Sequence, residues 1–249
     1  MTEVATALHA PNRIMQGLWI GPALSRLERL SIASFLENGH DYHLYVYEDV
    51  TNVPDGTTIR NGNEILHESL IFQYRDHKSF SAFANFFRYK LLLERGGWWV
   101  DSDTVCLRPF DLDLDYVFSS EAFQSRELVN CGVVKVPPES PAMSYAWSVC
   151  CTKRPELLKW GEVGPRLMAE SVAKLSLERF VMRARMFCPI DYLDWQSVLD
   201  PGRSWSFGDD VYAVHLWNEM WRRGRRDKDE HYHADCLYER LMRQYVADQ

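Results

Sequence analysis

The chain has 249 residues, is 46% hydrophobic and 25% charged, and carries a formal net charge of −7. These values match an ordinary globular protein and suit one large α/β domain or two small ones. The negative charge argues against nucleic-acid binding as the main task, so we expect no nucleic-acid partner. No segment approaches about eighteen uninterrupted apolar residues, which excludes a membrane-spanning helix. The N-terminus lacks a basic start and a long apolar run, so we expect no signal peptide and a cytoplasmic protein.

The first predicted elements form a β-α-β unit. The run at 13–21 is short and apolar and ends in glycine, which predicts a buried strand. Residues 22–39 place leucines and Phe35 at helical spacing, and Gly39 follows as a stop signal. Residues 42–49 alternate and are rich in β-formers, which predicts a second strand. Strand, helix and strand in this order indicate a parallel, right-handed unit.

A long helix and a short apolar strand come next. After a turn and a shorter helix at 63–70, the pattern predicts a helix at 79–95. Ser79 can cap its start, and the glycine pair that follows it can supply a left-handed cap at its end. The strand at 98–100 has one tryptophan for each face and leads directly to Asp101.

The rest of the chain continues with strands and helices. We predict strands at 116–121, 128–136 and 211–217, helices at 140–151 and 164–176, and an amphipathic helix in the stretch from 229 onward. Ser140 and Pro141 suit the cap and the first position of the helix that they begin. No internal repeat, low-complexity tract or linker is apparent, so we expect a single mixed α/β domain over 1–249.

Two carboxylates, Asp101 and Asp103, follow the strand at 98–100. Residues two apart in an extended segment project to the same side, so the two side chains should converge. Converging carboxylates repel unless a cation lies between them, and Mg²⁺ or Mn²⁺ takes such oxygen ligands together with phosphate. Ligands of open α/β sheets bind at the carboxyl ends of the strands. The pattern predicts a metal that bridges protein and diphosphate; the alternative is an acidic turn or helix cap.

Other clusters have plainer interpretations. A second D-x-D, in 111–115, has no apolar strand before it and indicates a solvated loop. The basic run 221–228 indicates a solvated loop, with contact to anionic lipid through Arg222–Arg226 or to an acidic substrate as the alternative. Residues 231–236 lack the further ligands of a zinc site, and the acidic pair at 209–210 indicates a turn. The six cysteines indicate reduced, mostly buried thiols.

Several motifs together resemble one known family. Residues 83–103, "FANFFRYKLLLERGGWWVDSD", resemble the D-x-D region of glycosyltransferase family 32. Its relatives include capsular-polysaccharide and α-1,4-type sugar transferases and, more distantly, the large clostridial glucosylating toxins. "MQGLWIG" at 15–21 and "YAVHLWN" at 212–218 are similar to the first strand and the C-terminal H-x-W segment of the family, and "GP" and "FCP" match smaller pieces. The resemblance extends over 13–218.

The resemblance implies a GT-A fold, with a Rossmann-like mixed sheet flanked by helices. It implies a nucleotide-sugar-binding half at about 13–110 and an acceptor half at about 111–249. Asp103 would coordinate Mn²⁺ or Mg²⁺ directly, and Asp101 would bind the metal, a bridging water, or the ribose or sugar hydroxyls of the donor. His215 would complete the site as a neutral imidazole, which favours Mn²⁺. The alternative for His215 is a core histidine.

The resemblance also implies donor-binding residues. Trp19 would stack on the nucleotide base, with a core tryptophan as the alternative. Arg88 would bind phosphate or sugar hydroxyls and, with both aspartates, form the catalytic set. Asn85 shares a helix face with Arg88 and departs from the family, which usually has an aspartate there. Asn130 resembles a family asparagine near the sugar pocket, although such a residue at a strand end is often structural.

The sequence therefore predicts a metal-dependent retaining glycosyltransferase. Its partners would be a nucleotide sugar, UDP-linked rather than GDP-linked, and a saccharide or glycolipid acceptor. Peripheral contact with the inner face of the membrane through Arg222–Arg226 is the alternative to a solvated loop. One alternative is a sugar-nucleotide-binding protein with weak or lost transferase activity, which the neutral Asn85 keeps open. Another is a metal-dependent phosphodiester hydrolase, which normally needs a denser set of Asp and His ligands.

Overall fold

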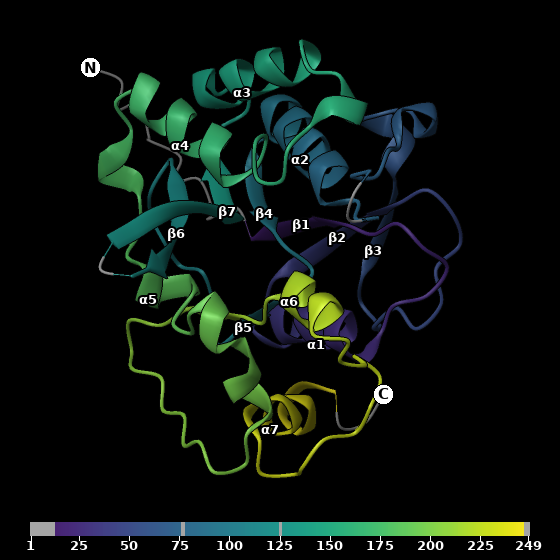
Figure 1. The fold of residues 1–249 in the computed structure, drawn as a ribbon, viewed down its shortest axis with the longest axis vertical. Coiled ribbons are helices and arrows are strands. Elements are labelled where there is room, and N and C mark those ends of the chain that lie inside the picture. Colours follow the sequence, from purple (N-terminus) through teal and green to yellow (C-terminus); the bar gives the residue numbers. More distant parts are fainter. Residues whose placement is uncertain (1–12, 76–77, 125, 247–249) are drawn as a thin grey trace, which may run out of the picture.

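A six-stranded mixed sheet is the centre of the fold in the computed structural model, which describes residues 13–75, 78–124 and 126–246 (Figure 1). Its strand order is β3-β2-β1-β4-β7-β6. The strands are β1 (Ile14–Leu18), β2 (Asp41–Val46), β3 (Thr58–Asn61), β4 (Gly97–Val100), β6 (Val117–Phe123) and β7 (Arg126–Val136). Strands β1 to β4 run parallel, whereas β7 is antiparallel to β4 and β6 antiparallel to β7.

The connection order creates a switch point between β1 and β4. The chain proceeds from β1 outward through β2 to β3, and then returns to the other side of β1 as β4. The carboxyl ends of β1 and β4 are therefore neighbours from which the connections leave in opposite directions. Such a point is where open α/β sheets bind ligands.

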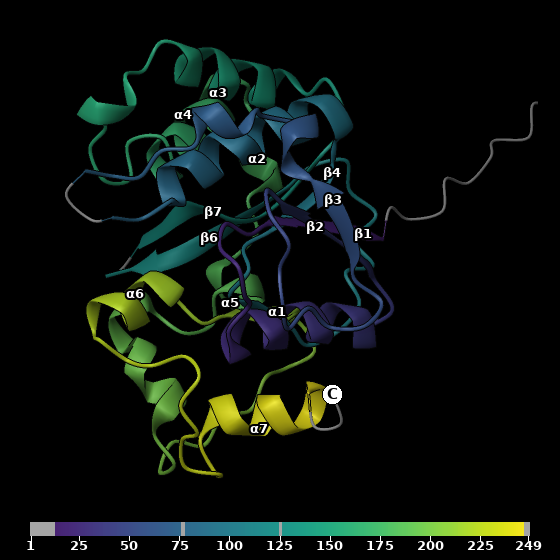
Figure 2. The same cartoon turned by 90° about the vertical axis from the view of Figure 1, so that its right-hand side faces the viewer.

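Helices cover both faces of the sheet (Figures 1 and 2). One face carries α2 (Ser81–Arg95), α3 (Pro141–Cys151) and α4 (Pro165–Lys174), and the other carries α1 (Arg26–Glu37) with α7 (Leu237–Tyr245) outside it. Trp98 belongs to the apolar core on the α1 face and Trp99 to the core on the α2 face. The expectation of one tryptophan on each covered face of this strand is confirmed.

A second, two-stranded sheet joins distant parts of the chain. It pairs β5 (Thr104–Cys106) antiparallel with β8 (Ala213–His215), so that Thr104 lies opposite His215. Two short helices flank β8, α5 (Ala184–Phe187) before it and α6 (Asn218–Arg223) after it. Because β5 follows the turn after β4, this pairing brings the C-terminal third of the chain to the carboxyl end of β4.

The local signals predicted most elements and misplaced some boundaries. Helix α1 has the complete capping box of Ser25 and Glu28. Helix α2 begins at Ser81, so Ser79 is not its N-cap; the Ser79 hydroxyl accepts a hydrogen bond from the Ser81 N–H instead. The glycine pair ends the helix as predicted, but Gly96 is not in the left-handed helical conformation: its φ is 61° and its ψ −158°, and a side chain there would collide with the backbone of Pro138.

Two further corrections concern shorter segments. The helix expected at 63–70 is replaced by two 3₁₀ turns, Gly62–Glu64 and Glu68–Leu70. In α3, Ser140 occupies the N-cap position, but its side chain makes no capping hydrogen bond. Residues 111–115 form an irregular loop with exposed aspartates, as expected. Within the described residues, none of the helices is both long and apolar enough to cross a membrane.

Candidate functional site

Asp101 and Asp103 lie just beyond β4, at the switch point between β1 and β4. The Asp101 N–H donates to the Gly132 carbonyl of β7 at 2.7 Å, and the Thr104 N–H donates back to the Asp101 carbonyl at 3.0 Å. Residues 102 and 103 therefore form a turn, not the extended segment expected from the sequence. The prediction that the carboxylates converge is nevertheless confirmed, because ligand atoms of both belong to one compact group.

His215 is the third member of this group. Single ligand atoms of Asp101, Asp103 and His215 all lie within 4.8 Å of one another, and this is the one such cluster found among the described residues. The antiparallel pairing of β5 and β8 places His215 opposite Thr104, next to Asp103. His215 Nε2 is 3.1 Å from Asp103 Oδ1, and both side chains are buried.

The second oxygen of Asp103 is also engaged. Asp103 Oδ2 accepts a hydrogen bond of 2.7 Å from the Asn218 N–H, at the first residue of α6. The bend that exposes this N–H lies at Trp217, whose backbone is left-handed, with φ 59° and ψ 53°. The Trp217 ring packs against His215 with a centroid distance of 4.1 Å, and the Cys188 sulfur lies 3.9 Å from His215 Nδ1.

Burial and mutual charge set the protonation of this pair. Burial alone lowers the pKa of His215, but the charge and the hydrogen bond of Asp103 outweigh it and raise that pKa well above its ordinary value. Burial likewise opposes ionisation of Asp103, yet His215 and the Asn218 N–H hold the pKa of Asp103 below its ordinary value. Without a cation, the two groups form a buried ion pair.

Arg88 lies on the other side of Asp101. Its guanidinium hydrogen-bonds Asp101 Oδ1 through Nη2 and Asn85 Oδ1 through Nη1, the latter at 2.8 Å. The same Asp101 oxygen accepts the Trp99 indole N–H at 2.8 Å, and the guanidinium carbon lies 4.7 Å from the centroid of the Trp99 ring. Arg88 is only 3% exposed, and its Nε is buried without a partner among the described residues.

Asn85 helps to hold the guanidinium of Arg88 in place. Its Oδ1 accepts from Arg88 and also lies 3.6 Å from the Cys131 sulfur. Its amide nitrogen lies close to Gly164, because a β-carbon on Gly164 would be 3.0 Å from Asn85 Nδ2. The neutral amide leaves Asp101 as the carboxylate that pairs with Arg88. Burial raises the pKa of Asp101 more than the charge of Arg88 lowers it.

Trp19 lies one residue beyond β1, and its backbone N–H donates to the Tyr45 carbonyl of β2 at 2.9 Å. The indole is partly buried, its Nε1 has no hydrogen-bond partner among the described residues, and Lys228 Nζ lies 5.3 Å from the ring centroid. One side of the ring therefore faces a cation from the segment before α7.

Asn130 is buried in β7, and both ends of its amide have protein partners. Its Oδ1 accepts from the Gly132 N–H, and its Nδ2 donates to Glu121 Oε2 at 2.8 Å. Gly132 itself faces the metal-ligand group, because a β-carbon there would lie 3.4 Å from Asp101 Oδ2 and 3.6 Å from His215 Cε1. Sequence reasoning named neither Glu121 nor Gly132 as a site residue, and no local motif distinguishes them.

The remaining clusters match their plainer interpretations, except for the basic run 221–228: a solvated loop is predicted there, but residues 221–223 belong to α6 and Trp221 is buried. Five of the six cysteines are buried and all six are free thiols. Residues 209–210 form an exposed turn. In the basic run, Arg222 and Arg223 both pair with Glu219. His231 and His233 are exposed at the approach to α7.

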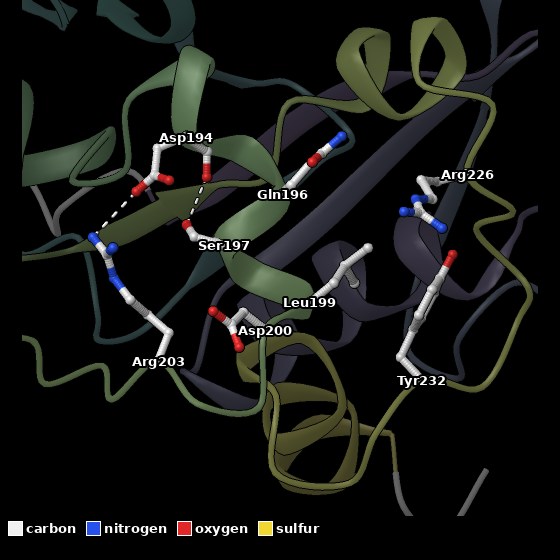
Figure 3. A pocket seen from close by; sticks show the side chains of 8 residues that line it. All are labelled: Asp194, Gln196, Ser197, Leu199, Asp200, Arg203, Arg226 and Tyr232. Carbon is white, nitrogen blue, oxygen red and sulfur yellow. Dashed lines mark hydrogen bonds and ion pairs between the residues drawn. The ribbon is translucent and has the colours of Figure 1, made fainter.

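An open pocket of about 460 Å³ lies in the C-terminal part of the structure (Figure 3). It is formed by the 3₁₀ segment η5 (Tyr192–Leu199), the loop after it and the segment before α7; in Figure 3, Arg203 turns toward Asp194 on one side, and Arg226 and Tyr232 lie on the other. None of the seven residues predicted for the site lines this pocket.

The mixed sheet flanked by helices is the fold of the GT-A-type glycosyltransferases. Among solved structures, the chain is similar to one described as PaToxG glycosyltransferase, with a TM-score of 0.51 and 13% identity over 66% of this chain and 70% of that one. A structure described as a transferase gives a TM-score of 0.43 and 10% identity, covering 66% of this chain and 84% of that one. The apo-form glycosyltransferase GlyE of Streptococcus pneumoniae TIGR4 gives a TM-score of 0.37 and 13% identity, covering 70% of this chain and 45% of that one.

Sequence comparison narrows the class. Residues 25–123 match the family model described as glycosyltransferase sugar-binding region containing DXD motif. Residues 157–246 match the model described as alpha 1,4-glycosyltransferase conserved region. No curated protein sequence matches the chain. Both models describe regions of glycosyltransferases, and the resemblance seen in the sequence is confirmed.

Proposed function

We propose that this protein is a retaining, divalent-metal-dependent glycosyltransferase. It transfers a sugar from a nucleotide-sugar donor to a hydroxyl of a saccharide or glycolipid. We favour a UDP-sugar over a GDP-sugar as the donor. The observation that carries the proposal is the compact group of Asp101, Asp103 and His215 at the switch point, directly beside the buried guanidinium of Arg88.

The three ligands suit a divalent cation such as Mn²⁺. Two carboxylates and one imidazole match the preferences of Mn²⁺ better than those of Mg²⁺, which takes oxygen ligands. Asp101 Oδ1 is occupied by Arg88 and Trp99, while its Oδ2 faces the same space over Gly132 as the His215 ring edge. When bound, the cation would neutralise part of the negative charge on the departing diphosphate.

Arg88 supplies fixed positive charge at the same place. Its guanidinium is held by Asn85, Asp101 and the face of Trp99, so it does not need to reorganise when negative charge develops nearby. Its Nε–H is buried without a partner, and a buried donor of this kind gains most from a ligand oxygen. We assign this donor to the diphosphate or to a hydroxyl of the transferred sugar.

We place the nucleotide base at Trp19. That residue directly follows β1, across the switch point from Asp101, and base–aromatic stacking contributes about 1–3 kcal/mol. Lys228, which lies over the ring, would sit beside the base or the phosphates. Asn130, whose amide is held on both sides, shapes the sugar end of the site.

The proposed reaction retains the configuration of the anomeric carbon. The acceptor oxygen attacks that carbon on the face from which the diphosphate departs, forming one C–O bond while the other breaks. The diphosphate leaves with the electron pair of the broken bond, and one of its oxygens takes the proton of the acceptor hydroxyl. Arg88 stabilises the negative charge that accumulates on the phosphate, and a cation held by Asp101, Asp103 and His215 would do the same.

Donor binding tests this proposal first. Thermal unfolding of the purified protein would be followed with UDP-Glc, UDP-Gal, UDP-GlcNAc and GDP-Man, each with Mn²⁺ and with a chelator. We expect one UDP-sugar to stabilise the protein only when Mn²⁺ is present, and Asp103→Ala to abolish this response and transfer while leaving the fold intact. An active Asp103→Ala enzyme that still responds to Mn²⁺ would overturn the assignment of the site.

The neutral Asn85 supports a second candidate, a nucleotide-sugar-binding protein with weak or lost activity. Here Arg88 has one carboxylate partner where an aspartate at 85 would give it two. Donor binding without turnover in the wild type, with turnover restored in Asn85→Asp, would favour this candidate. The phosphodiester hydrolase has less support, because the described residues offer one group of three ligands, too few for a two-metal site.

Membrane contact through Arg222–Arg226 remains a proposal of its own. Co-sedimentation with anionic and with neutral vesicles tests it. Binding to anionic vesicles that disappears at high salt would support the contact.

A further inference from the structure

We infer that Glu121 binds the acceptor, with a free carboxylate oxygen that accepts a hydrogen bond from an acceptor hydroxyl. The inference rests on the proposed transferase function. It starts from a carboxylate in β6 that lies outside the metal-ligand group and outside every motif in the sequence.

Two contacts connect Glu121 to the metal-ligand group. Glu121 Oε2 accepts from Asn130 Nδ2 at 2.8 Å, and Asn130 Oδ1 accepts in turn from the N–H of Gly132. Gly132 faces Asp101 Oδ2 and the His215 ring edge. The carboxylate therefore borders the site while its second oxygen, Oε1, is not used by Asn130.

An irregularity in the β6–β7 pairing creates this geometry. Phe118 pairs with Val134, but Ser120, two residues on, pairs with Val129, so residues 130–133 bulge opposite Ser119. The Ser119 hydroxyl accepts from the Val133 N–H at 3.1 Å and fills the gap in the ladder. Bulges of this kind re-aim side chains and are common beside active sites.

Glu121 lacks an ion-pair partner within the part of the chain that the structure describes. Among the described residues, no lysine or arginine pairs with it, and its polar partner is a neutral amide. Burial raises its pKa, and the hydrogen bond from Asn130 and the charge of His215 offset that effect only in part. Glu121 Oε1 is not among the buried unpartnered atoms of the described residues, so this oxygen is open to a ligand hydroxyl, and titratable groups with a shifted pKa concentrate at functional sites.

The position of Glu121 points to the acceptor and not to the nucleotide. Trp19 and Arg88 come from β1 and α2, whereas Glu121 comes from β6, beyond β7 in the strand order. A donor whose base lies at Trp19 and whose diphosphate lies at Arg88 directs its sugar toward β7. The hydroxyl that meets Glu121 then belongs to the molecule approaching from the β6 side.

The isosteric variant Glu121→Gln provides a sharp test. A glutamine can still accept from Asn130 with its carbonyl oxygen, but it presents an NH₂ donor where Glu121 presents an acceptor. Glu127→Gln is the matched control, because Glu127 is exposed on the same hairpin and accepts from the Ala184 N–H at 3.0 Å. Glu121→Ala shows whether any effect depends on the amide that replaces the carboxylate.

Two measurements are needed for each variant. The first is thermal stabilisation by Mn²⁺ with the UDP-sugar, and the second is release of nucleoside diphosphate with lactose, maltose and cellobiose as acceptors. We expect Glu121→Gln to keep the stabilisation and to lose about 10- to 100-fold in acceptor-dependent release, with the control unchanged. Loss of the stabilisation would move Glu121 to the donor side, and unchanged release would remove it from the site; either result overturns the inference. A wild type with neither response would instead count against the transferase function.

Discussion

Replacing Gly132 by alanine should disable the site while leaving the fold in place. A β-carbon at this position would lie 2.9 Å from Asn130 Oδ1, 3.4 Å from Asp101 Oδ2 and 3.6 Å from His215 Cε1. Gly132 does not have a positive φ, so alanine brings no backbone strain. The new methyl group acts through space alone, and it enters the region between the metal ligands.

The size of the effect follows from these distances. The contact with Asn130 is too short for carbon against oxygen, so the amide or the β7 backbone must move by several tenths of an ångström, at a cost to stability of about 1–3 kcal/mol. The other two contacts need no movement, but they narrow the space in which Asp101 and His215 meet a ligand. Since a misplacement of about 1 Å can cost about 100-fold in rate, we expect kcat/KM to fall by about 10- to 100-fold.

The assay compares Gly132→Ala with the wild type and with Gly202→Ala. Gly202 lies in an exposed turn, where a β-carbon would meet only Asp200 Oδ1, at 3.3 Å, so this control adds the same methyl group away from the site. Circular dichroism establishes folding, and transfer and Mn²⁺-dependent donor stabilisation report on function. A folded Gly132→Ala enzyme with wild-type kcat/KM and an unchanged response to Mn²⁺ would refute the reasoning.

Three other outcomes are expected. Trp99→Phe removes an indole N–H that donates to Asp101 at 2.8 Å, so chemical denaturation should show a loss of about 1–3 kcal/mol, and an unchanged stability would contradict the role given to this hydrogen bond. In the contact between α1 and α7, burial opposes ionisation of Glu239, but hydrogen bonds from Arg26 and the Tyr232 N–H lower its pKa below 4.5. The ionised Glu239 therefore contributes its full stabilisation above the ordinary pKa of a glutamate, and this stabilisation is lost as the pH falls through the lowered pKa of the folded state. Urea unfolding of Glu239→Gln should show a lower stability than the wild type near neutral pH, and the difference should shrink in acid. Chelation should stop transfer and added Mn²⁺ should restore it; transfer that persists after complete metal removal would exclude metal dependence.

Much of the fold was accessible from local patterns. Residues 79–103 show why: an amphipathic helix, a glycine pair and an apolar strand each carry a signal within a few residues, and the structure contains all three in that order. The failures were also local in origin. At 63–70 a helical pattern too short to sustain a helix formed two 3₁₀ turns, and at Ser79 a capping residue lay two positions before the first helical residue.

The sequence by itself determined where the acidic residues of the site lie, because Asp101 and Asp103 directly follow a strand that both faces of the sheet must bury. It also determined that Arg88 and Asn85 share a helix face, since residues three apart do so in any α-helix. Only the tertiary structure decided what these groups meet. His215 reaches Asp103 across 112 positions because β8 pairs with β5, and Glu121 reaches the site through a bulge in β7. Strand register and pairing depend on packing between distant segments, which short-range periodicity does not encode.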